Sequence, residues 1–355
     1  MQVRLEKLQN KLPQAGLDGL LIGNRENRLY MSGFTGSEGK LLVTREGAFL
    51  CVDFRYVEQA REQAPGWEIV EYQRPYTATL SRLITGLGLQ KVGFEKEYLS
   101  YQGYQSLLDN IPGIKWLPVA GLVESLRLQK DEAEIESIKR ASRLDDLAFG
   151  HIVEYLGPGL REREVALELE VFARRQGGEG ASFDIIVASG PRAALPHGVA
   201  SDKLLQAGEL VIMDFGTIVD SYHSDFTRTV IIGEPSAKQR KVYEVVREAQ
   251  ETALAAVAPG RSAGEIDALA RKVIADRGYG PYFGHGVGHG VGLNIHEGPQ
   301  LSPGAETVLL PGMVITIEPG IYIPGWGGVR IEDLLLVTET GCEVFTQSSR
   351  ELIKI

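Results

Sequence analysis

The chain has 355 residues, of which 43% are hydrophobic and 24% are charged, and its formal net charge is −10. A chain of this length usually forms two domains, and its negative charge argues against nucleic acid or an anionic membrane as the main partner. No apolar run approaches the ~18 residues that a membrane-spanning helix requires.

The first 122 residues alternate between helix and strand patterns. Residues 1–14 place Leu5, Leu8 and Leu12 on one face of an amphipathic helix and lack the apolar core of a signal peptide. Residues 27–39 are predicted to be turn-rich. Strands are predicted over 18–22, 41–43, 48–52, 68–70 and 91–94, and helices over 53–62, 77–87 and 101–110. This alternation predicts an α/β domain over 1–122, without a phosphate-binding loop or dinucleotide fingerprint.

The character of the sequence changes across residues 123–129, which we interpret as a linker to a second domain over 130–355. That domain begins with a long amphipathic helix predicted over 130–156. The breaks at Pro158-Gly159 and Pro259-Gly260 each separate two helix patterns, which suggests an internal duplication of a helix–helix–strands unit. The remaining predicted elements are helices over 163–175, 239–258 and 263–277, and strands over 185–188, 210–216, 227–232, 313–318 and 329–338.

The two cysteines, Cys51 and Cys342, lie far apart in the sequence, each in an apolar context typical of a strand. Buried free thiols in a reducing compartment are expected rather than a disulfide. We therefore expect a cytoplasmic protein.

The segment Phe283–Gly298, with the sequence FGHGVGHGVGLNIHEG, contains His285, His289 and His296, three of the six histidines. The first two have the spacing of zinc ligands on an HExxH helix, but the residues between them are Gly-Val-Gly. Because glycine costs about 1 kcal/mol relative to alanine inside a helix, the segment is predicted to be irregular or extended. Its alternating glycines allow the backbone to approach a metal or ligand closely. The alternative is a glycine-rich turn with solvated histidines.

Four carboxylates and one histidine interrupt or border apolar strand patterns in the second domain: Asp214, Asp225, His289, Glu318 and Glu332. A buried carboxylate is costly unless it is paired or bound to a metal. Each residue alone is typical of a salt-bridged strand end, but the simplest joint explanation is a site for two divalent cations, whose charges the four carboxylates balance. Oxygen-rich ligation with one imidazole and no thiolate favours Mn²⁺, Co²⁺ or Zn²⁺. Two such ions that share a hydroxide are typical of hydrolases.

These residues lie in motifs that resemble the proline peptidases, Xaa-Pro aminopeptidase and prolidase, among the "pita-bread" metallopeptidases. The resemblance covers the whole chain, and no ligand position is substituted. In the first domain it rests on NRLYMSGFTGSEG and VDFRYVEQA, and at the start of the second on LRLQKDEAEI. The remaining motifs are LPHG at 195–198, MDFG with Asp214, SDFTRT with Asp225, GHGVGLNIHE around His289, TIEPGIY with Glu318 and GVRIED with Glu332.

The resemblance implies a fold, an N-terminal creatinase-like α/β domain followed by a pita-bread catalytic domain, and a role for each ligand. Asp214 would chelate one metal ion with both oxygens, and Asp225 and Glu332 would bridge the two ions. His289 and Glu318 would bind the second ion. Glu332 would also activate the bridging water as general base.

The resemblance also implies roles for residues around the metals. His197 and His296 fall where the family places histidines that contact the substrate, stabilise the tetrahedral intermediate or transfer its proton. Tyr322 and Arg330 fall at positions beside the ligands or the substrate. Because Arg330 and Glu332 are two apart in a predicted strand, we expect the guanidinium to orient the carboxylate. His285 is expected either to line the pocket or to cap a loop carbonyl.

The implied activity is metal-dependent hydrolysis of the bond between an N-terminal residue and proline, in dipeptides or longer peptides, with two Mn²⁺, Co²⁺ or Zn²⁺ ions and in a homodimer. A methionine-aminopeptidase-like activity is an alternative, although LPHG and EPGIY favour the proline peptidases. Creatinase, which uses no metal, is disfavoured by the complete ligand set. A non-catalytic peptide- or protein-binding member of the fold is the remaining alternative, although such proteins typically lose ligands and none is lost here.

Overall fold

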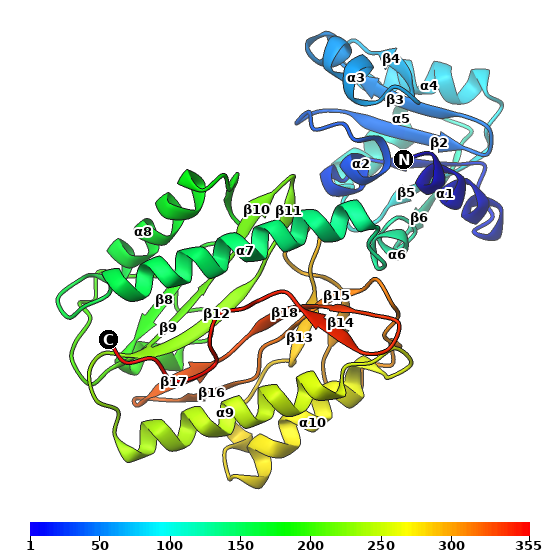
Figure 1. Cartoon of the computed structure of the whole chain (residues 1–355). Helices are drawn as coiled ribbons and strands as arrows, with labels where there is room; N and C mark the ends of the chain where they lie inside the picture. Colours follow the sequence, from blue (N-terminus) through cyan, green and yellow to red (C-terminus); the bar gives the residue numbers. More distant parts are fainter. The chain divides into compact units, whose positions relative to one another are not determined.

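A computed structural model describes residues 1–355 and divides into two compact units, Met1–Arg127 and Leu128–Ile355. Each unit has its own sheets and helices (Figure 1). None of the helices has the length and hydropathy needed to cross a bilayer.

The first unit contains one six-stranded mixed sheet with the order β4-β3-β2-β1-β5-β6. The central strand β1 pairs antiparallel with β2 and parallel with β5. The strands are β1 (Gly19–Ile22), β2 (Lys40–Thr44), β3 (Ala48–Val52), β4 (Glu68–Glu71), β5 (Lys91–Glu95) and β6 (Lys115–Val119). The helices are α1 (Gln2–Gln14), α2 (Arg25–Ser32), η1 (Phe54–Tyr56), α3 (Val57–Gln63), α4 (Tyr76–Gly86), α5 (Tyr101–Asn110) and α6 (Glu124–Arg127).

Helix α2 is a correction to the sequence analysis, because it occupies the first half of the segment predicted to be turn-rich. The Asn24 side chain caps it by accepting a hydrogen bond from the Asn27 backbone N–H at 2.8 Å. Gly33 ends it in the left-handed conformation, with φ of 77°. The eight-residue helix is too short for a clear helical periodicity, so its two caps were its main sequence signal. Strand β6 was also missed.

The second unit is built from two helix pairs and several antiparallel sheets. The helices are α7 (Glu132–Tyr155), α8 (Glu162–Arg175), η2 (Gly190–Ala194), α9 (Ala237–Ala256), α10 (Ala263–Asp276) and η3 (Gly280–Tyr282). The strands are β7 (Gly180–Ala181), β8 (Ile186–Ser189), β9 (Leu210–Phe215), β10 (Thr217–Val219), β11 (Tyr222–His223), β12 (Phe226–Ile231), β13 (Gly288–Gly290), β14 (Glu297–Leu301), β15 (Val314–Ile317), β16 (Gly320–Ile323), β17 (Gly327–Arg330), β18 (Asp333–Val337) and β19 (Cys342–Val344). The sheets have the orders β12-β9-β8, β11-β10-β7, β14-β13-β15-β18-β19 and β16-β17.

The two helix pairs are arranged in the same way, as the Pro-Gly breaks suggested. Helix α8 begins after Arg161, which forms an isolated bridge with Leu204, and α10 begins after Ser262, which forms one with Val308. One core packs α7 and α8 against β8, β9 and β12, and another packs α9 and α10 against β15, β17 and β18. Figure 1 shows one helix pair on either side of these strands.

The single strand predicted over 329–338 is wrong, because the chain forms two strands there. Ile331 and Glu332 lie outside regular structure, β17 pairs with β16, and β18 pairs with β15. The hydrophobic pattern continues across the break, so it gave no sign that the chain changes sheets there.

Candidate metal centre

The first two candidate ligands lie on one antiparallel ladder. Asp214 lies on β9 opposite Thr227 of β12, and Asp225 lies two residues before Thr227. Opposed residues of a ladder point to the same face, as do residues two apart in a strand. The regular pairing of β9 and β12 therefore brings both carboxylates to one face, and both are at least nine-tenths buried.

His289 lies on β13, where the ladder shifts register between His289 and Gly290. The flanking glycines are required here: an added Cβ would lie 2.0 Å from the Thr316 carbonyl oxygen at Gly288 and 2.0 Å from the Gly298 carbonyl oxygen at Gly290. The alternating glycines thus allow β13 to lie between close backbones, as the sequence predicted.

The remaining two carboxylates lie where strands end. Glu318 follows β15, and Glu332 lies in the break between β17 and β18. The five candidate ligands come together from these five places. One ligand atom each of Asp214, Asp225 and Glu332 lies within 4.8 Å of the others. His289 Nε2 lies 3.4 Å from Asp225 Oδ2 and 3.3 Å from Glu318 Oε1.

Two oxygens in this cluster have no hydrogen-bond partner although they are buried: Asp214 Oδ1 and Glu332 Oε1. Burial, together with neighbouring carboxylates, raises the pKa of Asp225 and of Glu332 well above the ordinary range. Burial also raises the pKa of Asp214, despite its ion pair with Arg330. Buried oxygens without donors beside carboxylates that repel one another fit divalent cations, whose charge supplies what the protein lacks.

His289 presents one ring nitrogen to the cluster, because its other nitrogen is engaged. Its Nδ1–H donates to the Gly290 carbonyl oxygen at 3.1 Å, so Nε2 is the nitrogen that faces Asp225 and Glu318, and in the neutral ring it can bind a metal. Burial by itself would raise the pKa of Glu318, but its hydrogen bond with His289 and the charge of that residue outweigh burial and lower the pKa to about 2. Glu318 is therefore ionised in the absence of metal.

Arg330 contacts Asp214 rather than Glu332, which corrects the expectation from their spacing in the sequence. Its Nη2 forms a short ion pair with Asp214 Oδ2, and its Nη1 donates to the Tyr322 hydroxyl at 2.7 Å. The reason is the strand break, which ends the alternation after Arg330 and removes Glu332 from its face. The link between Arg330 and Glu332 is Thr227, whose hydroxyl accepts from Arg330 Nε at 3.2 Å and donates to Glu332 Oε2 at 2.6 Å.

The candidate ligands line a cavity of about 770 Å³, and His197, His285, His296 and Tyr322 line it as well. The ring of His296 lies edge-to-face with the ring of His289, with 4.3 Å between centroids. His285 does both things considered from the sequence: it lines the cavity, and its Nδ1–H donates to the Gly286 carbonyl at 2.8 Å. Its Nε2 accepts from the Tyr322 hydroxyl at 3.0 Å.

Sequence reasoning missed the two threonines that hold the ligands. Thr227 donates to Glu332, and Thr316 donates to Glu318 Oε1 at 3.3 Å and accepts from the His289 backbone N–H at 3.1 Å. Both are fully buried. Their positions were a usable signal, because each lies two residues from a candidate ligand, Asp225 and Glu318, in a strand pattern.

Comparison with known protein families gives two matches that together cover most of the chain. Residues 4–129 match the creatinase/prolidase N-terminal domain, and residues 136–339 match metallopeptidase family M24. Among curated proteins, an Xaa-Pro dipeptidase of Pyrococcus furiosus is 41% identical over 356 residues, which cover 99% of this chain and 100% of the relative.

Solved structures with the same architecture carry related descriptions. An Xaa-Pro dipeptidase from Bacillus anthracis superposes with a TM-score of 0.98 at 47% identity, covering 100% of this chain and 99% of the other. An X-Pro aminopeptidase from Thermotoga maritima superposes with a TM-score of 0.90 at 38% identity, covering 96% and 98%. The predicted fold, an N-terminal creatinase-like domain followed by a pita-bread catalytic domain, is confirmed.

Proposed function

Because the chain belongs to metallopeptidase family M24, we propose that it hydrolyses the peptide bond between an N-terminal residue and proline at a site holding two divalent metal ions. The observation that carries this proposal is the cluster of Asp214, Asp225 and Glu332, with two buried oxygens that lack donors, beside His289 and Glu318 in one cavity. Relatives described as Xaa-Pro dipeptidases and prolidases support the substrate class.

In this proposal the five ligands divide between two ions. Asp214 would help to hold one ion, His289 and Glu318 would help to hold the other, and Asp225 and Glu332 would contribute to both. When bound, such ions lower the pKa of a shared water and polarise the scissile carbonyl. A donor set of oxygens and one imidazole without thiolate suits Mn²⁺, with Co²⁺ and Zn²⁺ as the other candidates.

The remaining steps use the chain's own side chains. Glu332 would take the proton of the attacking water: its Oε2 accepts from Thr227, and its Oε1 is buried without a hydrogen-bond partner. His296 and His197 stand at the cavity wall, where an imidazole can donate to the developing oxyanion and carry a proton to the proline nitrogen. Burial, followed by the charge of His289, lowers the pKa of His296, so this ring is neutral at neutral pH and can exchange a proton.

The side chains Arg330, Tyr322 and His285 form one hydrogen-bonded row along the cavity. Arg330 compensates the buried charge of Asp214, and its bond to Tyr322 fixes the phenol that donates to His285. Burial lowers the pKa of His285, which keeps this ring neutral and able to accept that bond. The row therefore gives the substrate a preorganised wall.

A second candidate function is hydrolysis of longer Xaa-Pro peptides. Arg330 is the one arginine or lysine that lines the cavity, and its guanidinium is already engaged by Asp214, Tyr322, Thr227 and the Pro196 carbonyl. The C-terminal carboxylate of a dipeptide would thus meet imidazoles instead of a free guanidinium. This feature favours a substrate whose chain continues past proline, which accords with the similarity to the X-Pro aminopeptidase of T. maritima.

The deciding experiment measures kcat/KM on Ala-Pro, Ala-Pro-amide and Ala-Pro-Gly, with the metal-depleted and the Mn²⁺-loaded protein. Metal-dependent release of alanine supports the proposed function, and its absence from all three substrates overturns it in favour of a non-catalytic binding protein. A higher value for Ala-Pro than for its amide supports dipeptidase activity, and the reverse order supports the aminopeptidase. Met-Ala-Ser, without proline, is the control for a methionine-aminopeptidase-like activity.

We also propose a homodimer in the cytoplasm. Cys51 and Cys342 are free, as expected in a reducing compartment, and burial raises the pKa of Cys51 to about 12, which keeps this thiol unreactive. Light scattering after gel filtration tests the dimer.

A further inference from the structure

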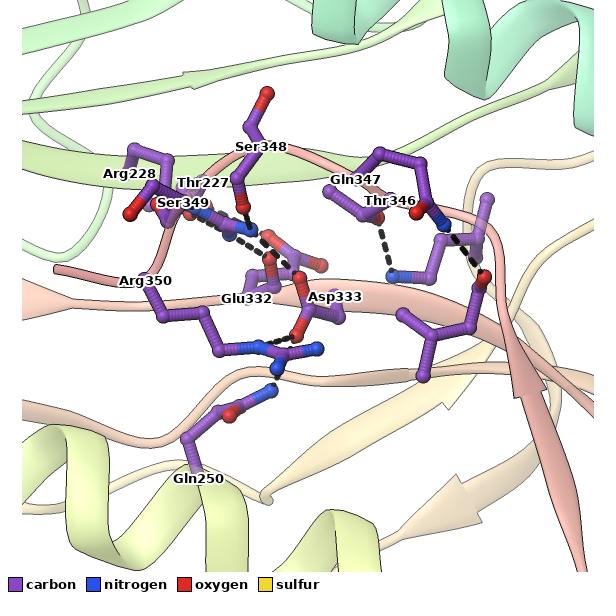
Figure 2. A network of polar contacts seen from close by, with 12 residues as sticks. Thr227, Arg228, Gln250, Glu332, Asp333, Thr346, Gln347, Ser348, Ser349 and Arg350 are labelled. Atoms are coloured by element: carbon purple, nitrogen blue, oxygen red, sulfur yellow. Dashed lines mark hydrogen bonds and ion pairs between the residues drawn. The ribbon is translucent and has the colours of Figure 1, made fainter.

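A buried ion pair, Arg228–Asp333, lies next in the chain to two residues of the candidate metal centre, Thr227 and Glu332. Glu332 belongs to the candidate metal centre and accepts a hydrogen bond from Thr227. The residues that follow these two in the chain, Asp333 and Arg228, form an ion pair (Figure 2). Both side chains of this pair are at most 1% exposed. The candidate ligand Glu332 is therefore followed directly by one member of the buried ion pair, Asp333. Thr227, which bonds Glu332, is followed directly by the other member, Arg228.

The backbone of Glu332 lies in the break between β17 and β18, so its hydrogen bonds are made with Thr227 and Arg228. Its N–H donates to the Thr227 carbonyl oxygen at 3.1 Å. Its carbonyl oxygen accepts a short hydrogen bond from Arg228 Nη1. A guanidinium therefore supplies the donor that a neighbouring strand would supply in a regular sheet.

Four further contacts fix the Arg228 guanidinium. Its Nη1 also donates to the Thr227 carbonyl oxygen at 2.9 Å, its Nε to the Ser349 carbonyl at 2.9 Å and its Nη2 to the Ser348 carbonyl at 2.8 Å. Nη2 meets Asp333 Oδ1 at 2.7 Å. The planar guanidinium can hold this geometry because its donors form a rigid fork.

The other oxygen of Asp333 connects the pair to two more parts of the unit. Oδ2 accepts from Gln250 Nε2 of α9 at 2.7 Å and from Arg350 Nε through a short ion pair. Figure 2 shows both donors converging on this carboxylate. Helix α9, strands β12 and β18 and the segment Ser348–Arg350 are therefore joined at one carboxylate behind Glu332.

We propose that the Arg228–Asp333 pair, closed by Arg350, is a positioning clamp that sets where the Glu332 carboxylate lies in the metal centre. This inference rests on the proposed function, in which Glu332 bridges the two ions. The Glu332 side chain has one hydrogen bond from the protein, from Thr227, so its direction is set mainly by its backbone. A bridging ligand must hold its place within a fraction of an ångström, and outer partners of ligands typically change metal affinity by about 10–100-fold.

The test is Arg350→Ala, with Arg350→Lys as the conservative variant. The Arg350 side chain is 30% exposed, and the substitution leaves Asp333 its bonds with Arg228 and Gln250, so we expect the fold to persist. In the Co²⁺-loaded protein we expect altered visible absorption bands, about tenfold weaker binding of at least one ion and about tenfold lower kcat at unchanged KM. Arg350→Lys should recover part of each loss.

The matched control is Arg247→Ala. Arg247 lies on α9 and forms a short ion pair with Glu351, so its removal loosens the same segment without touching Asp333. We expect wild-type Co²⁺ bands and affinity for this variant. If Arg247→Ala matches Arg350→Ala, general loosening explains the effect and the clamp is refuted.

Native bands and affinity in Arg350→Ala would also refute the clamp. If that variant does not fold, Gln250→Leu takes its place: it removes another donor to Asp333, and the Gln250 Oε1 atom has no partner to lose. Native bands and affinity there refute the clamp equally. A wild-type protein that binds no Co²⁺, or binds it and cleaves no Xaa-Pro bond, contradicts the proposed function instead and is recognised before any variant is compared.

Discussion

The two helix–helix–strands halves of the second unit have similar frames but present their candidate ligands differently. The first half, α7 to β12, presents Asp214 from within a ladder that pairs without interruption over six residue pairs, and Asp225 from the residue directly before that ladder. The second half, α9 to β18, presents His289 at a register shift, Glu318 at a strand end and Glu332 in a strand break. Regular pairing positions ligands in one half, and interruptions of pairing position them in the other.

The difference shows where each half obtains its rigidity. In the first half the backbone ladder fixes Asp214 and begins directly after Asp225. In the second, side chains replace missing ladder partners: Thr316 bonds the backbone of His289, and Arg228 bonds the carbonyl of Glu332. Without such a hydrogen bond, a buried backbone N–H or carbonyl would have no partner, which costs about 1–3 kcal/mol of stability. The second half is therefore expected to be more sensitive to substitutions outside the site.

Metal removal affects the ligands of both halves at once and has the largest expected effect. Chelation should abolish activity, and it should lower Tm because cation binding stabilises a cluster of carboxylates that otherwise repel one another. Activity and Tm should return with Mn²⁺ or Co²⁺. Calorimetry and elemental analysis check this, and a metal-free preparation with full activity would refute the dinuclear site.

Glu332→Ala tests the half that depends on interruptions. As the proposed bridge, Glu332 touches both ions, so its loss should remove at least one ion per chain and nearly all turnover. Arg330→Ala is the comparison: Arg330 touches Asp214 rather than the ions, so activity should fall while most of the metal remains. Elemental analysis and kcat decide, and a Glu332→Ala protein with two ions and near-native rates contradicts the bridge.

His296→Ala separates chemistry from metal binding within the second half. The proline nitrogen leaves poorly unless it is protonated, and loss of a positioned proton donor typically lowers rates by about 10²–10⁴-fold. We expect a decrease in kcat of that order, with two ions and the wild-type Tm retained. The control is His151→Gln, because His151 pairs with Glu168 and stacks on Phe172 instead of lining the cavity. Loss of metal would make His296 a ligand, and full activity would remove it from the mechanism.

The same contrast explains how far the sequence could predict the structure. Periodicity and Pro-Gly breaks identified the helices α7, α8, α9 and α10, and apolar runs identified β9 and β12. The five candidate ligands were chosen as ionisable residues in apolar strands, and the structure places all five together. Their roles as ligands remain predictions.

What the sequence could not predict depends on contacts between distant segments. The break at Ile331-Glu332 lies within a continuous hydrophobic pattern, and the Arg228 side chain that stabilises it comes from about a hundred residues earlier. Arg330 was assigned the wrong partner for the same reason, since strand alternation holds only while the strand continues. The short helix α2 lacked periodicity, and only its caps distinguished it from a turn.

The pH dependence of the metal-free protein compares the two halves carboxylate by carboxylate. Burial and neighbouring carboxylates raise the folded-state pKa of Asp225 and of Glu332 well above that of the unfolded chain. Between the two values the folded chain binds more protons, so the free energy of unfolding must fall as pH rises, by up to ~1.4 kcal/mol per pH unit for each group. Glu318, whose pKa is lowered to about 2, acts in the opposite sense and only under acid conditions. Denaturant unfolding from about pH 5 to about pH 8 should therefore show decreasing stability, and Asp225→Asn and Glu332→Gln should each flatten the slope. If both substitutions flatten the slope equally, the buried carboxylates of the two halves destabilise the metal-free protein by equal amounts. A slope that neither variant changes would show that these two carboxylates are not its source.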